Sequence, residues 1–101
     1  MCKNIKDFST ISKLEKLEIL DVGNTEISDI SFLEKNKNIK RLRLFDCENI
    51  EDFSTISKLE KLEFLDVDFT NISDISFLKK NKNIKEVKWR NKTYNKNDKI
   101  F

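Results

Sequence analysis

The chain has 101 residues, of which 38% are hydrophobic and 38% are charged, and its net charge is +2. A chain of this length forms one small domain with a modest core, and its apolar fraction excludes an intrinsically disordered chain. The single glycine and the absence of proline argue against a loop-rich fold or a flexible linker. With two cysteines, no export signal and no long apolar run, the sequence predicts a protein of a reducing compartment, the cytoplasm, that does not insert into a membrane.

The positive charge is concentrated at one end of the chain. Lys79 to Phe101 carries nine basic and two acidic residues, a net charge of +7, whereas residues 1–78 carry −5. A basic end of this kind can bind nucleic acid or an acidic protein surface, although a solvated edge rich in lysine and asparagine is the commoner explanation.

An internal repeat organises the sequence. Asp7 to Lys40 recurs at Asp52 to Lys85 with a constant offset of 45 residues, and 29 of the 34 positions are identical. Five pairs differ: Ile19/Phe64, Gly23/Asp68, Asn24/Phe69, Glu26/Asn71 and Glu34/Lys79. A repeat of this length predicts an architecture in which each unit packs against its neighbours.

Each copy contains two shorter units that begin with a strand. The pattern LxxLxLxxTxI starts at Leu17 and recurs, with substitutions, at Ile39, Leu62 and Ile84. Positions 4 and 6 of each unit are apolar and alternate with polar neighbours, which predicts a short strand with one buried face. Position 9 of the first three units is small and can hydrogen-bond the backbone of a turn. A second apolar group, with a spacing of about three, comes after each turn and predicts a 3₁₀ or α-helical return.

These features resemble the leucine-rich repeat family, whose unit is LxxLxLxx followed by Asn, Cys or Thr and a short return. The repeat length of 22–23 residues and the phrase Ile-Ser-Asp-Ile-Ser-Phe-Leu, at 27–33 and 72–78, are similar to internalin-type and SDS22-type proteins. The unit around Cys47 is similar to the cysteine-containing type. The resemblance implies an α/β solenoid, with a short parallel β-sheet of about four strands on the concave face and 3₁₀ or short helical turns on the convex face.

The resemblance also divides the single domain, residues 1–101, into full repeats between two ends. The repeats cover residues 17–38, 39–61 and 62–83. Because the ends of a solenoid expose core unless they are capped, we expect a half-repeat cap at residues 1–14 and a C-terminal strand and cap at 84–101. The C-terminal apolar lid is expected to contain Trp89, Tyr94, Ile100 and Phe101.

Positions 2, 3, 5, 7 and 8 of each unit are expected to point outward on the concave face, where stacking places equal positions in columns about 4.8 Å apart. Position 2 reads Glu, Lys, Glu, Lys from the first unit to the fourth, and position 5 reads Asp, Arg, Asp, Lys. Opposite charges on adjacent strands favour one register by about 0.2–1 kcal/mol per pair. These two columns are therefore expected to specify stacking more than to contact a ligand.

The other outward positions carry large apolar residues. Phe64 occupies position 3 in the middle of its strand, whereas Phe45 and Phe69 occupy positions 7 and 8 near the strand ends. Exposed aromatic clusters mark interaction sites, although Phe45 and Phe69 could equally fold into the turn. Three of the five differences between the copies fall on outward positions, which indicates either a diversified surface or drift. The candidate partner-binding residues are Phe64 first, then Phe45, Phe69, Arg41, Arg43, Asp68 and Ile19.

Residues of common catalytic and metal sites are scarce. There is no histidine, the commonest general base and metal ligand. Cys2 and Cys47 are expected about 9–10 Å apart, which is too far for a disulfide. Two thiols without histidine also do not form a zinc site. Asp29, Asp52 and Asp74 recur at one turn position and are expected to accept hydrogen bonds there. We therefore expect no enzyme activity, no metal and no cofactor.

The resemblance and the exposed aromatic residues together predict a scaffold whose concave face binds another protein. A second hypothesis is that the basic end binds nucleic acid or an acidic partner, with phosphate contacts from Lys82, Lys85, Lys88, Arg90 and Lys92. A third is that the chain is a non-binding remnant of a larger repeat array. No small-molecule substrate is expected.

Overall fold

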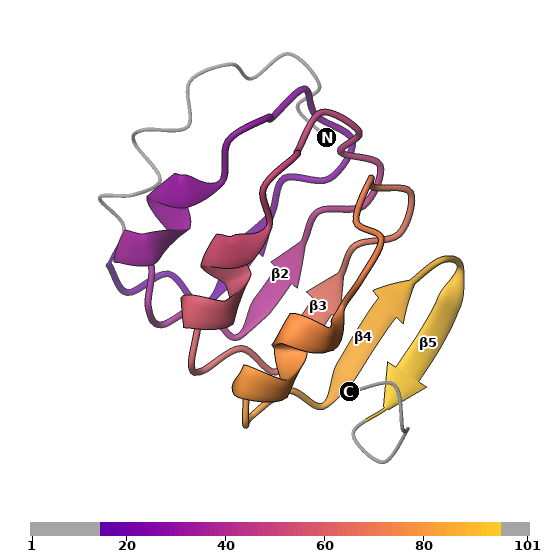
Figure 1. Ribbon diagram of the computed structural model, residues 1–101. Coiled ribbons are helices and arrows are strands. Elements are labelled where there is room, and N and C mark those ends of the chain that lie inside the picture. The colour runs from indigo at the N-terminus through magenta and orange to yellow at the C-terminus, as the bar shows by residue number, and fades with distance from the viewer. Residues whose placement is uncertain (1–14, 96–101) are drawn as a thin grey trace.

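The structure is a computed structural model that describes residues 15–95 of the chain. The expected N-terminal cap at residues 1–14, Cys2, and the lid residues Ile100 and Phe101 lie outside the described residues. Residues 15–95 form a solenoid of two layers, a sheet and a row of 3₁₀ helices (Figure 1).

One layer is a five-stranded sheet in the order β1-β2-β3-β4-β5. The first four strands are parallel, and their equal positions are paired: Ile19 lies opposite Arg41, Arg41 opposite Phe64, and Phe64 opposite Glu86. These strands are β1 Ile19–Asp21, β2 Arg41–Arg43, β3 Phe64–Asp66 and β4 Glu86–Trp89. The four expected strands and their register are confirmed.

The other layer consists of three 3₁₀ helices, one in each connection between two parallel strands. They are η2 Ser31–Lys35, η3 Ser54–Lys58 and η4 Ser76–Lys80, and they lie in a row beside the sheet (Figure 1). This arrangement confirms the expected solenoid with strands on one side and short helical turns on the other. Within residues 15–95, no helix is long and apolar enough to cross a membrane.

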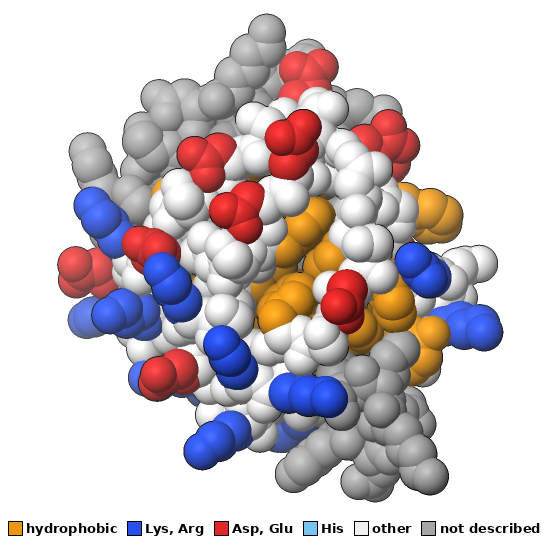
Figure 2. Space-filling view, in the orientation of Figure 1, with side chains coloured by type: hydrophobic (Ala, Val, Ile, Leu, Met, Phe, Trp, Pro, Cys, Tyr) orange, Lys and Arg blue, Asp and Glu red, His pale blue; other side chains and the backbone are white. Residues whose placement is uncertain are grey.

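The core lies between the two layers and is filled by the inward positions of the strands. Two positions are buried in every unit. Position 4 holds Leu20, Leu42, Leu65 and Val87, and position 6 holds Val22, Leu44, Val67 and Trp89. Burying an aliphatic side chain contributes roughly 1.5–3 kcal/mol, and strands this short achieve it only by stacking on the next repeat. Hydrophobic side chains remain visible in a hollow between the convex turns (Figure 2).

Position 9 closes the turns as the sequence predicts. The Thr25 hydroxyl donates to the Val22 carbonyl oxygen at 2.7 Å, and the Thr70 hydroxyl donates to the Val67 carbonyl oxygen at 2.7 Å. The fully buried Cys47 thiol donates to the Val22 carbonyl oxygen of the preceding repeat at 3.1 Å. Cys47 therefore links two repeats, and a small residue is required because it lies inside the stack.

A buried asparagine connects two convex turns, a contact that apolar periodicity does not predict. Asn81 comes directly after η4, is 1% exposed, and donates its side-chain N–H groups to the carbonyl oxygens of Ile56 at 3.1 Å and Leu59 at 2.9 Å. These carbonyl oxygens lie at the end of η3 and already accept the backbone N–H groups of Leu59 and Leu62, each at 3.0 Å, so Asn81 gives each of them a second hydrogen bond. Asn36 is buried at the same position of the first copy.

The sheet ends in a hairpin that the sequence did not predict. Strand β5, Lys92–Asn95, runs antiparallel to β4, and Trp89 pairs with Lys92 across a two-residue loop. The loop residues Arg90 and Asn91 have φ values of 54° and 61°, as in a type I′ turn. Arg-Asn lacks the glycine that usually marks such a turn, so the sequence indicated only a cap.

Trp89 closes the core at this end. It is buried, and its indole N–H donates to the carbonyl oxygen of Ile72 at 3.2 Å. Tyr94 on β5 is half-buried, and its ring centroid lies 6.2 Å from that of Trp89. The two rings form the described part of the expected apolar lid.

Three aspartates precede the convex helices at equivalent positions. The carboxylates of Asp29, Asp52 and Asp74 each accept a hydrogen bond from the backbone N–H two residues later, at 2.8 or 2.9 Å. Because this hydrogen bond favours the charged form, it lowers the pKa of each carboxyl from its ordinary value. The predicted role of these residues as turn acceptors is confirmed.

We expect the three aspartates to make folding stability sensitive to acid. Since their pKa values are lower in the folded than in the unfolded chain, the stabilisation is present above the unfolded pKa and is lost as the pH falls through the folded pKa. A variant carrying Asp29→Asn, Asp52→Asn and Asp74→Asn should lose less stability than the unchanged protein between about pH 5 and pH 2. Urea unfolding at a series of pH values measures this difference.

The exposed glutamates Glu26, Glu48 and Glu51 provide a control of equal charge. Replacing all three by glutamine removes three negative charges but leaves the turn hydrogen bonds intact. If both triple variants change the acid response equally, the turn hydrogen bonds are not its source.

Candidate functional site

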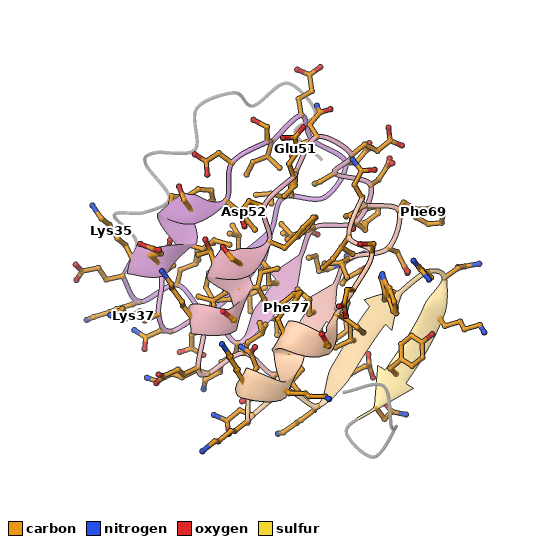
Figure 3. The ribbon with its side chains drawn as sticks, in the orientation of Figure 1. Lys35, Lys37, Glu51, Asp52, Phe69 and Phe77 are labelled. Atoms are coloured by element: carbon orange, nitrogen blue, oxygen red, sulfur yellow. The ribbon has the colours of Figure 1, made fainter. Side chains whose placement is uncertain are left out.

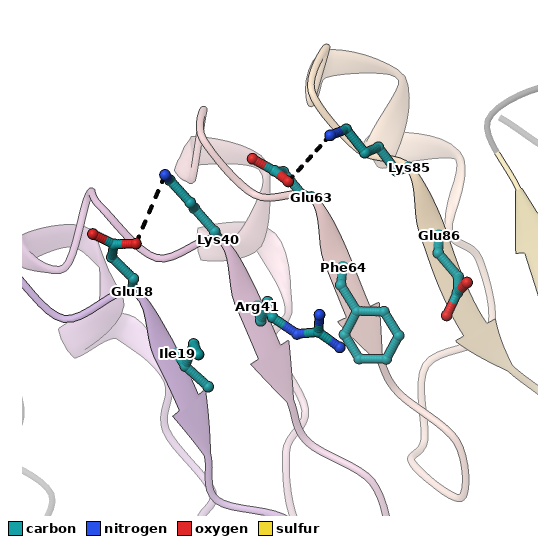
Figure 4. A pocket seen from close by; sticks show the side chains of 8 residues that line it. All are labelled: Glu18, Ile19, Lys40, Arg41, Glu63, Phe64, Lys85 and Glu86. Atoms are coloured by element: carbon teal, nitrogen blue, oxygen red, sulfur yellow. Dashed lines mark ion pairs between the residues drawn. The ribbon is translucent and has the colours of Figure 1, made fainter.

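An open groove crosses the four parallel strands on the face of the sheet that points away from the 3₁₀ helices (Figure 4). Its volume is about 340 Å³. Positions 2 and 3 of each unit line it: Glu18, Ile19, Lys40, Arg41, Glu63, Phe64, Lys85 and Glu86. The groove therefore lies on the predicted concave face and is built on strands rather than on loops.

Ion pairs between neighbouring strands run along position 2 (Figure 4). Lys40 Nζ lies 3.7 Å from Glu18 Oε1, and Lys85 Nζ lies 3.3 Å from Glu63 Oε1. All four side chains are accessible to solvent, so each pair contributes less than about 1 kcal/mol. The predicted charge pairing in this column is confirmed.

Arg43 joins three strands through the carboxylates at position 5. Its Nη1 atom lies 3.3 Å from Asp21 Oδ2, and its Nε atom lies 3.4 Å from Asp66 Oδ2. Asp66 is 4% exposed, and its Oδ1 atom accepts a hydrogen bond from the Asp68 backbone N–H at 3.1 Å. Arg43 thus supplies the positive charge that offsets a buried carboxylate, which is a structural task separate from its predicted role in partner binding.

Position 3 forms a second row across the groove, in the order Ile19, Arg41, Phe64 and Glu86 (Figure 4). The guanidinium carbon of Arg41 lies 4.8 Å from the centroid of the Phe64 ring on the next strand. Arg41 forms no ion pair with any residue in the range 15–95, and Ile19 is 63% exposed. This row therefore offers apolar surface and one cation that has no acidic partner among the described residues.

Phe45 is half-buried because it packs over Gly23 of the preceding repeat. A Cβ atom on Gly23 would lie 2.4 Å from two carbons of the Phe45 ring. On the same ring, the guanidinium carbon of Arg43 lies 4.8 Å from the centroid. The Gly23/Asp68 difference between the copies therefore has a packing cause, because only glycine leaves room for this ring.

The second copy uses the corresponding positions differently. Asp68 Oδ1 accepts a hydrogen bond from the Asn91 backbone N–H at 2.7 Å, which holds the turn between β4 and β5. Phe69 projects outward from the loop after β3 and is 63% exposed (Figure 3). Of the seven predicted binding residues, the structure brings Ile19, Arg41 and Phe64 together in the groove and places Phe69 outside it.

Two of the five residues predicted to contact phosphate are engaged within the chain. Lys85 pairs with Glu63, and the guanidinium carbon of Arg90 lies 4.4 Å from the centroid of the Trp89 ring. The other three lie elsewhere on this end of the chain. Lys82 follows η4, Lys88 lies on β4, and Lys92 is the first residue of β5.

The groove offers charge and aromatic surface rather than reactive groups. Within residues 15–95, no three His, Cys, Asp or Glu side chains are close enough together to hold a metal ion. The carboxylates of Asp21 and Asp66 are instead held by a guanidinium, that of Arg43.

Comparisons with known proteins agree with this architecture. The family model described as Zer-1-like, leucine-rich repeats, matches residues 6–90. An internalin (inlF) from Listeria monocytogenes is similar with a TM-score of 0.78 and 28% identity, over 87% of this chain and 26% of its own. An internalin C2 (inlC2) from the same organism has a TM-score of 0.78 and 28% identity, over 85% of this chain and 38% of its own. The chain thus spans less than half of either internalin, and no curated protein matches it.

We expect any side chain at residue 23 to destabilise the fold, because the Phe45 ring occupies the space above Gly23. Gly23→Ala should lower the free energy of unfolding by about 1–3 kcal/mol, since the ring or the backbone must move. In a Phe45→Ala background the same substitution should cost much less. Urea unfolding of the four proteins measures both costs, and equal costs would show that the ring is not the source of the conflict.

We also expect Arg43 to contribute more to stability than an exposed lysine of the same face. Arg43→Ala should lower the free energy of unfolding by about 1–3 kcal/mol, because it leaves the buried carboxylate of Asp66 without its cation. Lys40→Ala, which breaks an exposed pair, should cost less than about 1 kcal/mol. Thermal and urea unfolding compare the two, and equal losses would contradict the structural role of Arg43.

Proposed function

The chain belongs to the Zer-1-like leucine-rich repeat family, and from this premise we propose that it is a scaffold that binds another protein across its concave face. The observation that carries the proposal is the position-3 row, in which Ile19, Arg41 and Phe64 lie side by side in the groove and Arg41 has no internal ion pair within residues 15–95. Repeat modules of this family are protein-interaction modules, which supports the same function.

The chemistry of this row suits a protein partner. Arginine and aromatic residues contribute most of the binding energy in protein interfaces. Stacking against the Phe64 ring restrains Arg41, so that less conformational entropy is lost when a partner binds. The ring and Ile19 offer apolar surface, while the Arg41 N–H groups can donate to a carboxylate or carbonyl oxygen of the partner.

The remaining predicted binding residues support this site indirectly. Arg43 ties β2 to β1 and β3, Asp68 holds the β4–β5 turn, and Phe45 packs over the first repeat. These contacts hold in place the strands that carry the position-3 row. A partner can therefore bind the row without a rearrangement of the backbone. A preorganised surface binds more tightly than one that must order first.

Three further proposals concern the chain as a whole. Leucine-rich-repeat and internalin-like families are generally scaffolds rather than enzymes, and we propose the same of this chain. We propose a cytoplasmic location, supported by the Cys47 thiol, which is buried and hydrogen-bonded to a carbonyl oxygen. The division into repeats at 17–38, 39–61 and 62–83, with caps on either side, is also proposed.

We expect the partner, isolated from the native host with the full chain as bait, to depend on the position-3 row. Phe64→Ala and Arg41→Ala should each weaken its binding by about ten-fold or more, because each removes a central contact. Isothermal titration calorimetry measures the affinities. Phe64→Ile, which introduces the residue of the first copy, should weaken binding less than Phe64→Ala.

Lys58→Ala on the convex side serves as the control and should leave the affinity unchanged, because Lys58 pairs with Glu34 in the helix layer, away from the groove residues. If neither groove variant weakens binding, the concave face is not the site. Binding that falls steeply with salt and persists in Phe64→Ala would instead indicate phosphate contacts by the basic end.

A further inference from the structure

Phe69 has a backbone conformation that an aromatic residue rarely adopts. Position 8 has positive φ in all four units: 57° at Asn24, 59° at Asp46, 58° at Phe69 and 61° at Asn91. Asparagine and aspartate tolerate this left-handed region, whereas a bulky side chain is an outlier there. Three units therefore carry the residue that the turn favours, and only the third unit carries one that the turn disfavours.

Burial in the core does not account for this exception. The Phe69 side chain is 63% exposed, so most of its apolar surface stays in water. The corresponding residue of the first copy is Asn24, within a stretch that is otherwise nearly identical. A residue that is unfavourable for the backbone and is left exposed points to a function outside folding.

Phe69 borders a pocket that is separate from the groove. The pocket has a volume of about 330 Å³ and lies between the loop after β3 and the β4–β5 turn. Its lining is Val67, Phe69, Thr70, Asn71, Ile72, Ser73, Trp89, Arg90 and Asn91. None of these residues lines the groove, and hydrophobic and basic side chains lie together on this side of the molecule (Figure 2).

Arg90 is the only charged residue among the described residues that line this pocket. Its guanidinium lies over the Trp89 ring, and its Nη2 atom donates to the Ser73 carbonyl oxygen at 3.5 Å. It forms no ion pair with a carboxylate among residues 15–95. The pocket thus combines an exposed ring with one cation that is held in place and has no acidic partner in that part of the chain.

The surroundings decide which ligand class fits. From Lys79 to Asn95 the chain carries seven basic residues and one acidic residue, Glu86, so this end attracts anions. However, the Asp68 carboxylate lies at the β4–β5 turn beside Arg90, where its Oδ1 atom accepts a hydrogen bond from the Asn91 backbone N–H at 2.7 Å. A single cation beside an apolar surface, with the Asp68 carboxylate held at the same turn, suits one carboxylate rather than a run of phosphates.

We propose that this pocket is a second docking site, which binds a peptide segment of a partner protein that carries a large apolar side chain next to an aspartate or glutamate. The apolar side chain packs on Phe69, and the carboxylate binds the guanidinium of Arg90. The Arg90 guanidinium orients the segment, because it is the only cation among the described residues that line the pocket. This site acts independently of the concave groove.

A library of random short peptides displayed on phage and panned against the full chain tests the proposal. We expect the enriched peptides to carry an apolar residue adjacent to an acidic one. A synthetic peptide of the enriched sequence should change the fluorescence of Trp89, the only tryptophan of the chain, which lines the pocket. No enrichment, or enrichment without the acidic residue, would overturn the proposal.

Substitutions locate the peptide. Phe69→Asn and Arg90→Asn should each weaken its binding by about ten-fold, and both keep a residue that tolerates positive φ. Phe64→Ala should leave the affinity unchanged, which separates this pocket from the groove. Equal affinity for Phe69→Asn and the unchanged chain, or displacement of the peptide by a single-stranded oligonucleotide, would overturn the assignment.

Stability provides an independent readout. Phe69→Asn should raise the midpoint of thermal unfolding by about 4 °C, because it relieves the strained backbone, and Asn24→Phe should lower it by a similar amount. The variant that binds less should therefore be the more stable one. A lower midpoint for Phe69→Asn would show that the ring serves packing and would overturn the argument from strain.

Discussion

The groove and its surroundings depend on one constraint, the parallel register that places equal positions of successive repeats side by side. Strands β1, β2 and β3 have three residues each, too few to be stable alone. Backbone hydrogen bonds continue the ladder past the strand ends, from Val22 N–H to the Arg43 carbonyl at 3.1 Å and from Leu44 N–H to the Asp66 carbonyl at 2.8 Å. Because the pairing extends past the strand ends, the side chains of one column cannot shift independently.

The alternating charges make this register specific in a chain whose two halves are nearly the same. The first and third units are so similar that the third could stack where the second belongs. That arrangement would place Glu18 beside Glu63 and Asp21 beside Asp66, with like charges directly opposite. In the observed order, lysine and arginine side chains separate these carboxylates. The exposed pairs at position 2, which add little stability, therefore still discriminate against an incorrect stack.

The sequence predicts the features that arise from periodicity and misses those that depend on single contacts. The same apolar pattern occurs in four units and pairs in one register. It therefore predicts the strands, the 3₁₀ turns and the grouping of Ile19, Arg41 and Phe64. The β5 hairpin could not be predicted, because its turn uses Arg90-Asn91 without glycine. Other features depend on interactions between neighbouring repeats or on a backbone angle, which a pattern of apolar positions does not encode: the packing of Phe45 over Gly23, the Asn81 hydrogen bonds and the positive φ of Phe69.

The positions at which the two copies differ are not equally free to change. Residue 23 is coupled to Phe45 on the next repeat, so a side chain at 23 requires a smaller residue at 45, whereas Asp68 is coupled only to the backbone N–H of Asn91. Ile19 is largely exposed, so replacement at position 3 alters the surface but not the stack. Position 8 accepts a new side chain at the cost of backbone strain. Of the three outward positions at which the copies differ, positions 3 and 8, which hold Phe64 and Phe69, therefore change without the steric conflict that a side chain in place of Gly23 would meet at position 7.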